Sequence, residues 1–352
     1  MISRNLLAYA TACAGFVLIA CAPPNYNIKA PSPSGLKYLV TGQPAETNFS
    51  LLDERRVDGK VFSHGILPAE LKIDNVPIDP LPFLASQLQA EFVSRGLPAK
   101  VSDRSTAPPA IHLKSYHMEN MRTNAYTPFV TLTYISADVE AAGKTSRVGV
   151  FVTRGKTPVW SFEEIIDPVF NQPLSLGIQE FASKIANLVY GYRAGDDTVK
   201  TLTAKIKGTR TPNSFLDVYA LGFTNNPAAI DTLIGLAKDE QEYVRQAAIA
   251  SLGNIGATTQ FGLLKSIYQD AQVSWQDHSI ALKAIADLNT DESKDFVTAE
   301  AKRLGSDSAK ESQVLGRPSI SEVSRRAQRF LSAAANSGSA MNAAIRRCTP
   351  IW

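Results

Sequence analysis

The spacing of apolar positions between residues 48 and 195 predicts helices and strands in alternation. Asp79 and Pro80 suit the cap and the first turn of a helix, and apolar side chains then recur every three or four residues as far as Gly96. Farther along, apolar and polar residues alternate in three runs, which is the period of half-buried strands. These runs contain Ile111 and Leu113, then Val130, Leu132 and Tyr134, and then Val148, Val150 and Val152.

Shorter signals complete this first region. Gly143 and Gly155 are each followed by lysine and are typical of hairpin turns, so a fourth strand is expected at 159–162. A further strand is expected at 49–53, and Ser175 can cap a second amphipathic helix. The pattern therefore predicts an α+β domain in which two helices cover an antiparallel sheet.

The second half of the chain shows helical spacing alone, and one short motif recurs in it. A small residue, an aliphatic residue and another small residue stand at 220–222, 251–253 and 284–286, which are 31 and 33 positions apart. Periods of this size are typical of stacked helical repeats, in which each helix pair buries one apolar face against its neighbours. We expect an all-α repeat region over 211–336, with its last helix at 323–334.

The stretch 239–256 resembles a HEAT repeat of the short bacterial type. The resemblance implies that Val244 and Arg245 open the second helix of a unit, and that Gly253 near its end lets neighbouring helices approach closely. It also implies a partner surface on the second helices, which makes Arg245 and Gln246 candidate interaction residues. An arginine at this place in HEAT repeats can instead bind an acidic residue of the next repeat, and both roles stay open.

The N-terminus has the order of an export signal. Arg4 precedes an uncharged apolar run at 6–19, which is shorter than the roughly 20 residues of a membrane-spanning helix. The run ends in Leu18-Ile19-Ala20-Cys21, which resembles the lipobox of bacterial lipoproteins. The resemblance implies cleavage before Cys21 and attachment of acyl chains, palmitate among them, to that cysteine. With Ala22 in place of aspartate, it further implies the outer membrane, with the protein facing the periplasm.

These patterns divide the chain into five segments. Residues 1–20 are the expected signal peptide, and 21–47 are the expected lipidated cysteine and proline-rich tether. The α+β domain then covers 48–195, the HEAT-like region 211–336 and a loose tail 337–352. The polar interval at 196–210 is assigned to neither domain, and each domain is expected to fold separately.

Composition and charge agree with this organisation and exclude other classes of protein. The 352 residues are 44% hydrophobic and 20% charged, which is enough for a sizeable core. The formal charge of +3 becomes +2 without Arg4, so nothing points to a nucleic-acid partner. The three cysteines are Cys13, Cys21 and Cys348, and cleavage and lipidation would leave Cys348 as the single thiol.

No residue pattern predicts a metal, a cofactor or catalysis. The four histidines form no H-E-x-x-H motif, and His112 and His117 are expected on opposite faces of a strand. The adjacent acidic pairs at 163–164 and 196–197 cannot face each other across a substrate as two catalytic carboxylates do.

Three arginines near the end of the chain are further candidates for an interaction site. Arg325, Arg326 and Arg329 could bind an acidic partner or lipid headgroups, although such a charge run is also typical of a solvated helix face.

The sequence therefore predicts a binding protein without enzymatic activity. The favoured function is a membrane-anchored scaffold or adaptor that binds a protein partner through HEAT-like repeats. An alternative is an accessory subunit of an envelope transport or assembly system, because the element order of the first domain resembles that of small envelope lipoproteins. A third is an enzyme, since some short bacterial HEAT proteins resemble bilin lyases. The expected export and the missing nucleophile or acid–base set argue against an enzyme.

Overall fold

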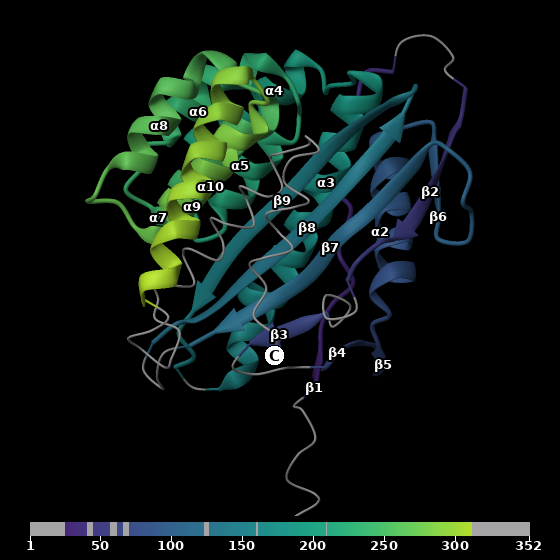
Figure 1. Cartoon of the computed structure of the whole chain (residues 1–352), viewed down its shortest axis with the longest axis horizontal. Helices are drawn as coiled ribbons and strands as arrows, with labels where there is room; N and C mark the ends of the chain where they lie inside the picture. Colours follow the sequence, from purple (N-terminus) through teal and green to yellow (C-terminus); the bar gives the residue numbers. More distant parts are fainter. Residues whose placement is uncertain are drawn as a thin grey trace, which may run out of the picture.

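The computed structural model describes residues 25–40, 45–56, 62–65, 70–122, 127–159, 161–208 and 210–311, with the backbone alone for Phe162 and 304–311. Figure 1 shows a sheet with helices behind it and a helical stack along one side. This arrangement confirms the predicted α+β region followed by an all-α region. Buried apolar residues of both regions form one continuous core.

The main sheet contains the predicted antiparallel strands, and further strands that run parallel to them make it a mixed sheet. Its strands lie in the order β6-β2-β7-β8-β9, with β3 beside β7. Strands β7, β8 and β9 form the predicted antiparallel meander, whereas β2 runs parallel to both β6 and β7, and β3 parallel to β7. The bounds are β2 Thr47–Asp53, β3 Ser63–Gly65, β6 Ala99–Ser102, β7 Ala110–Met121, β8 Phe129–Ala141 and β9 Lys144–Lys156.

The hairpin between β8 and β9 confirms one predicted turn and removes the other. Ala142 and Gly143 have φ of +51° and +72°, as a tight two-residue hairpin turn requires. From this turn the pairing runs without a break to Phe129 opposite Lys156, so Gly155 lies inside β9 and makes no turn. The described residues of the stretch expected to be a fourth strand contain none, because a 3-10 helix, η2 (Phe162–Ile165), begins there.

Two long helices cover one face of the sheet. Helix α2 (Pro80–Arg95) begins with Asp79 at the cap position and Pro80 in the first turn, as predicted, although the Asp79 side chain makes no capping hydrogen bond; it ends at Gly96 in the left-handed conformation. Helix α3 (Gln172–Tyr190) begins three residues before Ser175, because a π-helical turn, η3 (Asp167–Asn171), leads directly into it. Ser175 is therefore no cap.

The described part of the proline-rich segment is packed against the domain, so the prediction of a loose tether is wrong there. Strand β1 (Asn25–Asn27) pairs with β4 (Glu70–Ile73), and β4 pairs with β5 (Val76–Pro77) in a second, small sheet. Ile28, Leu36 and Tyr38 are buried in the core. We call residues 28–39 the strap.

The all-α region is a two-layer stack, seen at the left of Figure 1. Helices α5, α7 and α9 pack against one another as an inner layer, and α4, α6 and α8 each cover one of them from outside. The bounds are α4 Asp196–Lys207, α5 Ser214–Gly222, α6 Ile230–Leu236, α7 Glu242–Ile255, α8 Phe261–Gln269, α9 Trp275–Asp287 and α10 Asp291–Glu311. Short 3-10 turns, η4 Pro227–Ala229 and η5 Thr258–Gln260, precede α6 and α8.

Helix α4 occupies the polar interval that the sequence left unassigned, so the helical stack begins near residue 196. The helix predicted at 323–334 and the tail at 337–352 lie outside the described residues. Among the helices that the structure describes, none is long and apolar enough to cross a membrane.

The repeat period is also visible in the backbone. Asn225, Gly256 and Asn289 have φ of +54°, +73° and +53°, and each follows the end of an inner helix. These positions are 31 and 33 residues apart, as the small-aliphatic-small motifs are. A left-handed residue after each inner helix turns the chain toward the next outer helix.

Close approach of the inner helices depends on the glycines of that motif. A Cβ on Gly253 would lie 2.5 Å from Ala284 Cα, and a Cβ on Gly222 would lie 2.4 Å from Ser251 Cβ. These distances confirm that small residues let adjacent helices touch. Replacing either glycine forces the two helices apart.

We therefore predict that Gly253→Ala destabilises the protein by about 1–3 kcal/mol through overpacking. Gly235→Ala is the matched control, because Gly235 is also helical but has no atom within 4 Å of its added Cβ. This control should be stabilising by about 0.4–1 kcal/mol. Urea unfolding followed by circular dichroism measures both, and equal midpoints for the two variants would contradict the predicted packing.

Candidate functional site

The inner helix layer faces the α+β domain, and one arginine of the sheet reaches across. Arg154 on β9 places its guanidinium 4.0 Å from the ring centroid of Phe215 on α5 and 3.7 Å from that of Tyr243 on α7. Its Nη2 donates to Gln172 Oε1 at 3.0 Å. Burial lowers the pKa of Arg154 below its usual value. The cation–π contacts with the two rings therefore replace part of the stabilisation that the guanidinium loses when it leaves water.

Tyr243 also bonds the sheet directly. Its hydroxyl donates to the carbonyl oxygen of Gly155 at 2.7 Å, and it accepts from the Gly155 N–H at 3.3 Å. The start of α7 is thus fixed to the end of β9 by both ring and hydroxyl.

Two lysines and two carboxylates form the centre of the interface. Lys184 Nζ on α3 lies 2.8 Å from Glu180 Oε1 and 2.7 Å from Asp287 Oδ1, and donates to the Gly149 carbonyl oxygen on β9. Lys283 Nζ on α9 lies 2.5 Å from Glu180 Oε1 and 2.9 Å from Asp287 Oδ2. We call these four side chains the charge cluster. Its formal charge is zero, and it joins α3, β9 and α9.

Burial sets the electrostatics of the charge cluster. Burial alone would lower the pKa of Lys283, but the carboxylates of Asp287 and Glu180 hold that pKa above its ordinary value. Lys283 and Glu180 are 2% and 1% exposed, so removal of either partner leaves a charge with little access to water. Burial, with Glu180 nearby, raises the pKa of Tyr219 to about 12. The phenol therefore stays neutral beside the charge cluster.

A hydrogen-bonded set of neutral side chains continues the interface along α3. Ser183 Oγ donates to Asn225 Oδ1 at 2.8 Å, and Asn225 Nδ2 donates to the Ser183 carbonyl oxygen at 2.9 Å. Asn254 Nδ2 donates to Ser183 Oγ at 3.1 Å. The hydroxyl of Tyr38, in the strap, donates to the Phe223 carbonyl oxygen at 2.6 Å. Consecutive repeats thus bind the same turn of α3.

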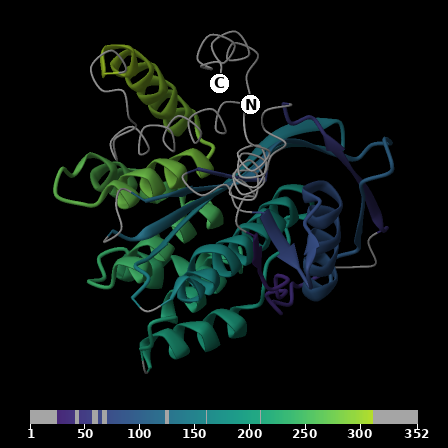
Figure 2. The ribbon, with the colours of Figure 1, turned by 90° about the horizontal axis from the view of Figure 1, so that it is seen from below.

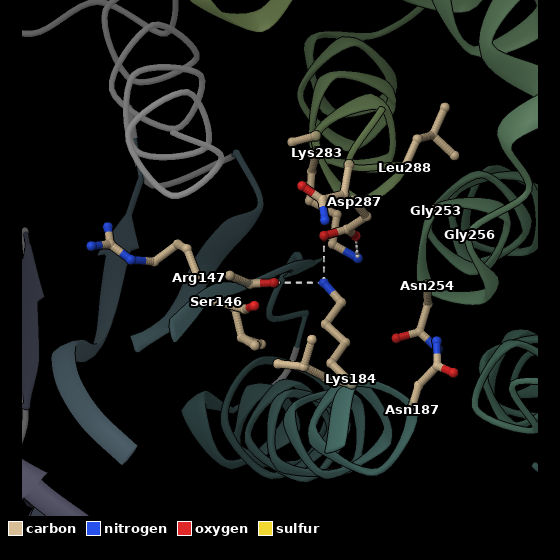
Figure 3. A pocket seen from close by; sticks show the side chains of 15 residues that line it. Ser146, Arg147, Lys184, Asn187, Gly253, Asn254, Gly256, Lys283, Asp287 and Leu288 are labelled. Atoms are coloured by element: carbon tan, nitrogen blue, oxygen red, sulfur yellow. Dashed lines mark hydrogen bonds and ion pairs between the residues drawn. The ribbon is translucent and has the colours of Figure 1, made fainter. Parts of the chain in front are cut away.

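A cavity of about 290 Å³ opens where these groups meet. Figure 3 shows Lys184, Lys283 and Asp287 joined at its floor, with Asn187 and Asn254 on one wall and Arg147 at the rim. Arg147 Nη2 donates to Asp138 Oδ2 at 2.9 Å, so each cation that lines the cavity is already paired with a carboxylate. The cavity therefore offers no free charge to a ligand, and its walls serve to join the two regions.

Of the two candidate interaction residues on α7, Gln246 is buried, whereas Arg245 keeps 24% of its side chain exposed and is held in an ion pair. Arg245 Nη2 lies 2.9 Å from Asp277 Oδ2 at the start of α9, and Nη1 donates to the Asp239 carbonyl oxygen at 2.9 Å. Gln246 is 2% exposed and donates to Glu242 Oε1 at 2.9 Å. The start of α7 lies between the sheet and the next repeat, so Arg245 has the alternative role that the HEAT resemblance allowed. It holds one repeat to the next.

Cys21, Arg325, Arg326 and Arg329 lie outside the described residues. No group of three or more His, Cys, Asp or Glu that could bind a metal occurs in the part of the chain that the structure describes.

The histidines of β7 correct another expectation. The register shifts between Leu113 and Ser115, so His112 opposite Asp138 and His117 opposite Tyr134 share one face of the sheet. His117 packs 4.8 Å from the Tyr134 ring, and burial, with His64 and Arg55 nearby, lowers its pKa to about 3. His117 is therefore a neutral ring that packs against Tyr134 and is half-buried.

The interface residues could have been found from the sequence by one signal. Arg154 continues the alternation of Val150 and Val152, which places a charge on the buried face of a strand. Glu180 and Lys283 likewise stand among the apolar positions of α3 and α9. A charged residue at an apolar position of the pattern predicts a buried pair, although it does not name the partner.

We predict that Lys283→Met destabilises the protein by about 3–5 kcal/mol, because Glu180 and Asp287 would then share Lys184 alone. Adding Glu180→Gln removes the excess carboxylate and should restore part of this loss. Lys200→Met is the control, since the Lys200–Asp197 pair is exposed, and it should change stability by no more than about 0.5 kcal/mol. Denaturant unfolding measures all three. A Lys283→Met variant as stable as the control would show that the cluster does not hold the interface.

Comparison with known proteins supports the prediction of HEAT repeats in the helical region. The family model for HEAT repeats matches residues 218–286, from within α5 to within α9. No curated protein matches the chain. A crystal structure described as an uncharacterized protein is similar over 48% of this chain and 98% of its own, with 9% identity and a TM-score of 0.26. A TM-score this low does not indicate a shared fold. The match over residues 218–286 is therefore the finding that bears on function, and it identifies this part of the helical stack as HEAT repeats.

Proposed function

We propose that the protein is a lipid-anchored scaffold of the bacterial envelope that binds a protein partner through the outer layer of its HEAT-repeat stack. The observation that carries the scaffold role is the match of residues 218–286 to HEAT repeats, which form extended binding surfaces. The lipid anchor, the envelope location and the binding of a protein partner are likewise proposed.

The choice of the outer layer follows from the occupied inner one. Arg154, the charge cluster and the Ser183–Asn225 bonds bury the inner helices against the same chain. A partner that used this face would have to displace the buried ion pairs of the charge cluster, at a cost of several kcal/mol. Within residues 218–286 the outer layer consists of α6 and α8, so the proposed surface lies on these two helices.

Those two helices carry matching aliphatic pairs. Ile230 and Ile234 on α6, and Leu263 and Ile267 on α8, are half-buried, and each α8 residue follows its α6 counterpart by 33 positions. Residues four apart lie on the same helix face, so each helix presents one aliphatic pair. Equivalent apolar pairs on consecutive repeats offer a partner a repeated contact.

The anchor rests on the sequence of the N-terminus. An uncharged run at 6–19 after Arg4, followed by the lipobox-like Leu18-Ile19-Ala20-Cys21, supports export and lipidation. Two or more acyl chains hold a protein stably on a membrane, whereas one does not. Ala22 supports the outer membrane, with the folded part in the periplasm.

The anchor is tested by labelling cells with a fatty-acid probe. The wild type should be labelled, and Cys21→Ser should fall to background, because the thiol is the attachment atom. Cys348→Ser is the matched control and should keep the full label. Equal labelling of the wild type and Cys21→Ser would rule out lipidation at this cysteine.

The binding face is tested with a photo-crosslinking amino acid placed in living cells at Ile234 or Ile267. Both positions should give an adduct of the same added mass, because they belong to one surface. Val93, which is 62% exposed on α2, is the control and should give no such adduct. An adduct at Val93 and none at the other two positions would move the partner to the α+β domain and favour the accessory-subunit function.

A further inference from the structure

The strap shows at which end of the α+β domain the chain enters. The Lys29 N–H donates to Asn171 Oδ1 at 2.9 Å, at the start of α3. Farther along, the Tyr38 N–H donates to the Arg95 carbonyl oxygen at 3.1 Å, at the end of α2, and the Leu39 N–H donates to the Arg193 carbonyl oxygen at 2.8 Å. The strap therefore runs the length of both helices. The chain enters where α2 and α3 begin, and we call this end of the domain, with β1, β4 and β5, the anchor pole.

Chain length then limits how far this pole can stand from an anchor at Cys21. Asn25 is four residues after Cys21, and four residues span at most about 14 Å. Helix α3 has 19 residues, so the opposite end of the domain lies about 28 Å farther along the helix axis. Figure 1 shows β1, β4 and β5 together at the lower edge of the molecule.

From this we infer that the anchor pole rests on the lipid bilayer and that the tip of the β4–β5 hairpin meets the membrane interface. The inference rests on the proposed lipidation of Cys21.

The hairpin is fixed to the segment that the anchor would hold. Asn27 Nδ2 donates to Asn75 Oδ1 at 2.7 Å, and the Asn75 N–H donates to Asn27 Oδ1 at 3.0 Å. Tyr26 stacks on Phe170 with 5.8 Å between ring centroids, which joins β1 to the turn before α3. Val76, next to Asn75, is 66% exposed, the largest exposed fraction among the exposed large hydrophobic residues.

The charge of the anchor pole indicates which force acts there. Lys72 is paired with Glu70 at 3.0 Å, and Asp74 and Asp79 add negative charge. With Lys29 the pole has two cations against three anions, so it is not a basic patch for anionic lipids. Contact with the bilayer is apolar and should not depend on salt.

The free energies of burial show that the acyl chains and the hairpin have different roles at the membrane. Burying one valine contributes at most about 1.5–3 kcal/mol, whereas each buried methylene of an acyl chain contributes about 0.8 kcal/mol. The acyl chains therefore hold the protein on the membrane. The hairpin and the short link to Asn25 set which end faces it.

The test places an environment-sensitive NBD fluorophore at single cysteines of the full-length acylated protein, in a Cys348→Ser background and in vesicles of zwitterionic phosphatidylcholine. Val76→Cys samples the anchor pole. Val93→Cys and Leu39→Cys are matched controls, because their native side chains are 62% and 59% exposed at the opposite end. Lipid-attached doxyl groups should quench the label at position 76 at least about twofold more than the labels at 93 and 39. Adding about 1 M salt, which shortens the Debye length to about 3 Å, should leave the difference unchanged.

Fatty-acid labelling of the same preparations separates the two proposals. Acylated protein with equal quenching at 76, 93 and 39, or with stronger quenching at 93 or 39, overturns the orientation and leaves the anchor standing. A difference that disappears in high salt overturns the apolar contact. Protein that carries no acyl chain overturns both the anchor and the orientation.

Discussion

The charge cluster of Lys184, Lys283, Glu180 and Asp287 is the constraint on which the rest of the structure depends. Its four members come from α3 and α9, and Lys184 adds a bond to β9. A buried lysine or carboxylate without its partner costs several kcal/mol, so the three elements have to come together for any of these charges to be tolerated. The net contribution of such a cluster to the free energy of unfolding is small, and its main effect is to determine how the elements pack. It fixes one arrangement of the repeat stack on the α+β domain, and the cation–π contacts of Arg154 with Phe215 and Tyr243 fix the same arrangement elsewhere along the interface.

This arrangement changes what the repeats can do. A HEAT stack that stands free offers its inner helices to a partner, whereas here those helices are bound to the sheet and to α3 of the same chain. The α+β domain therefore occupies the face that a free stack would offer to a partner, and the two regions share one core. The same interface bears on whether the two regions fold separately. A fragment that begins near residue 196 would expose Lys283 without Glu180 and leave Asn225 without Ser183, so its stability would be well below that of the intact chain.

The elements with a strong local pattern were predictable, and those built by distant contacts were not. Alternation identified β7, β8 and β9, and helical spacing identified α2, α6, α7 and α9, because each buries one face against a continuous core. The strap was missed because its proline-rich composition suggests an extended chain, while it bonds to residues as distant as Glu91 and Phe223, which are 57 and 185 positions away. The bulge in β7 was missed because alternation assumes an unbroken register, so His117 was placed on the wrong face. Arg245 had two possible roles, and only the position of Asp277 decides between them.

The strap and the charge cluster together determine how the free surface of the repeats would be presented. Because the strap begins at the anchor pole, the chain enters the domain there. The charge cluster holds the helical stack at the side of the α+β domain, and Figures 1 and 2 show the stack in this place. If the anchor pole lies on the membrane, α6 and α8 face sideways, neither toward the bilayer nor into the protein. A partner that contacts Ile234 and Ile267 would then be reached beside the anchor, along the membrane plane. Because the link from Cys21 to Asn25 is only four residues long, the distance of α6 and α8 from the membrane would be set by the fold and not by a flexible spacer.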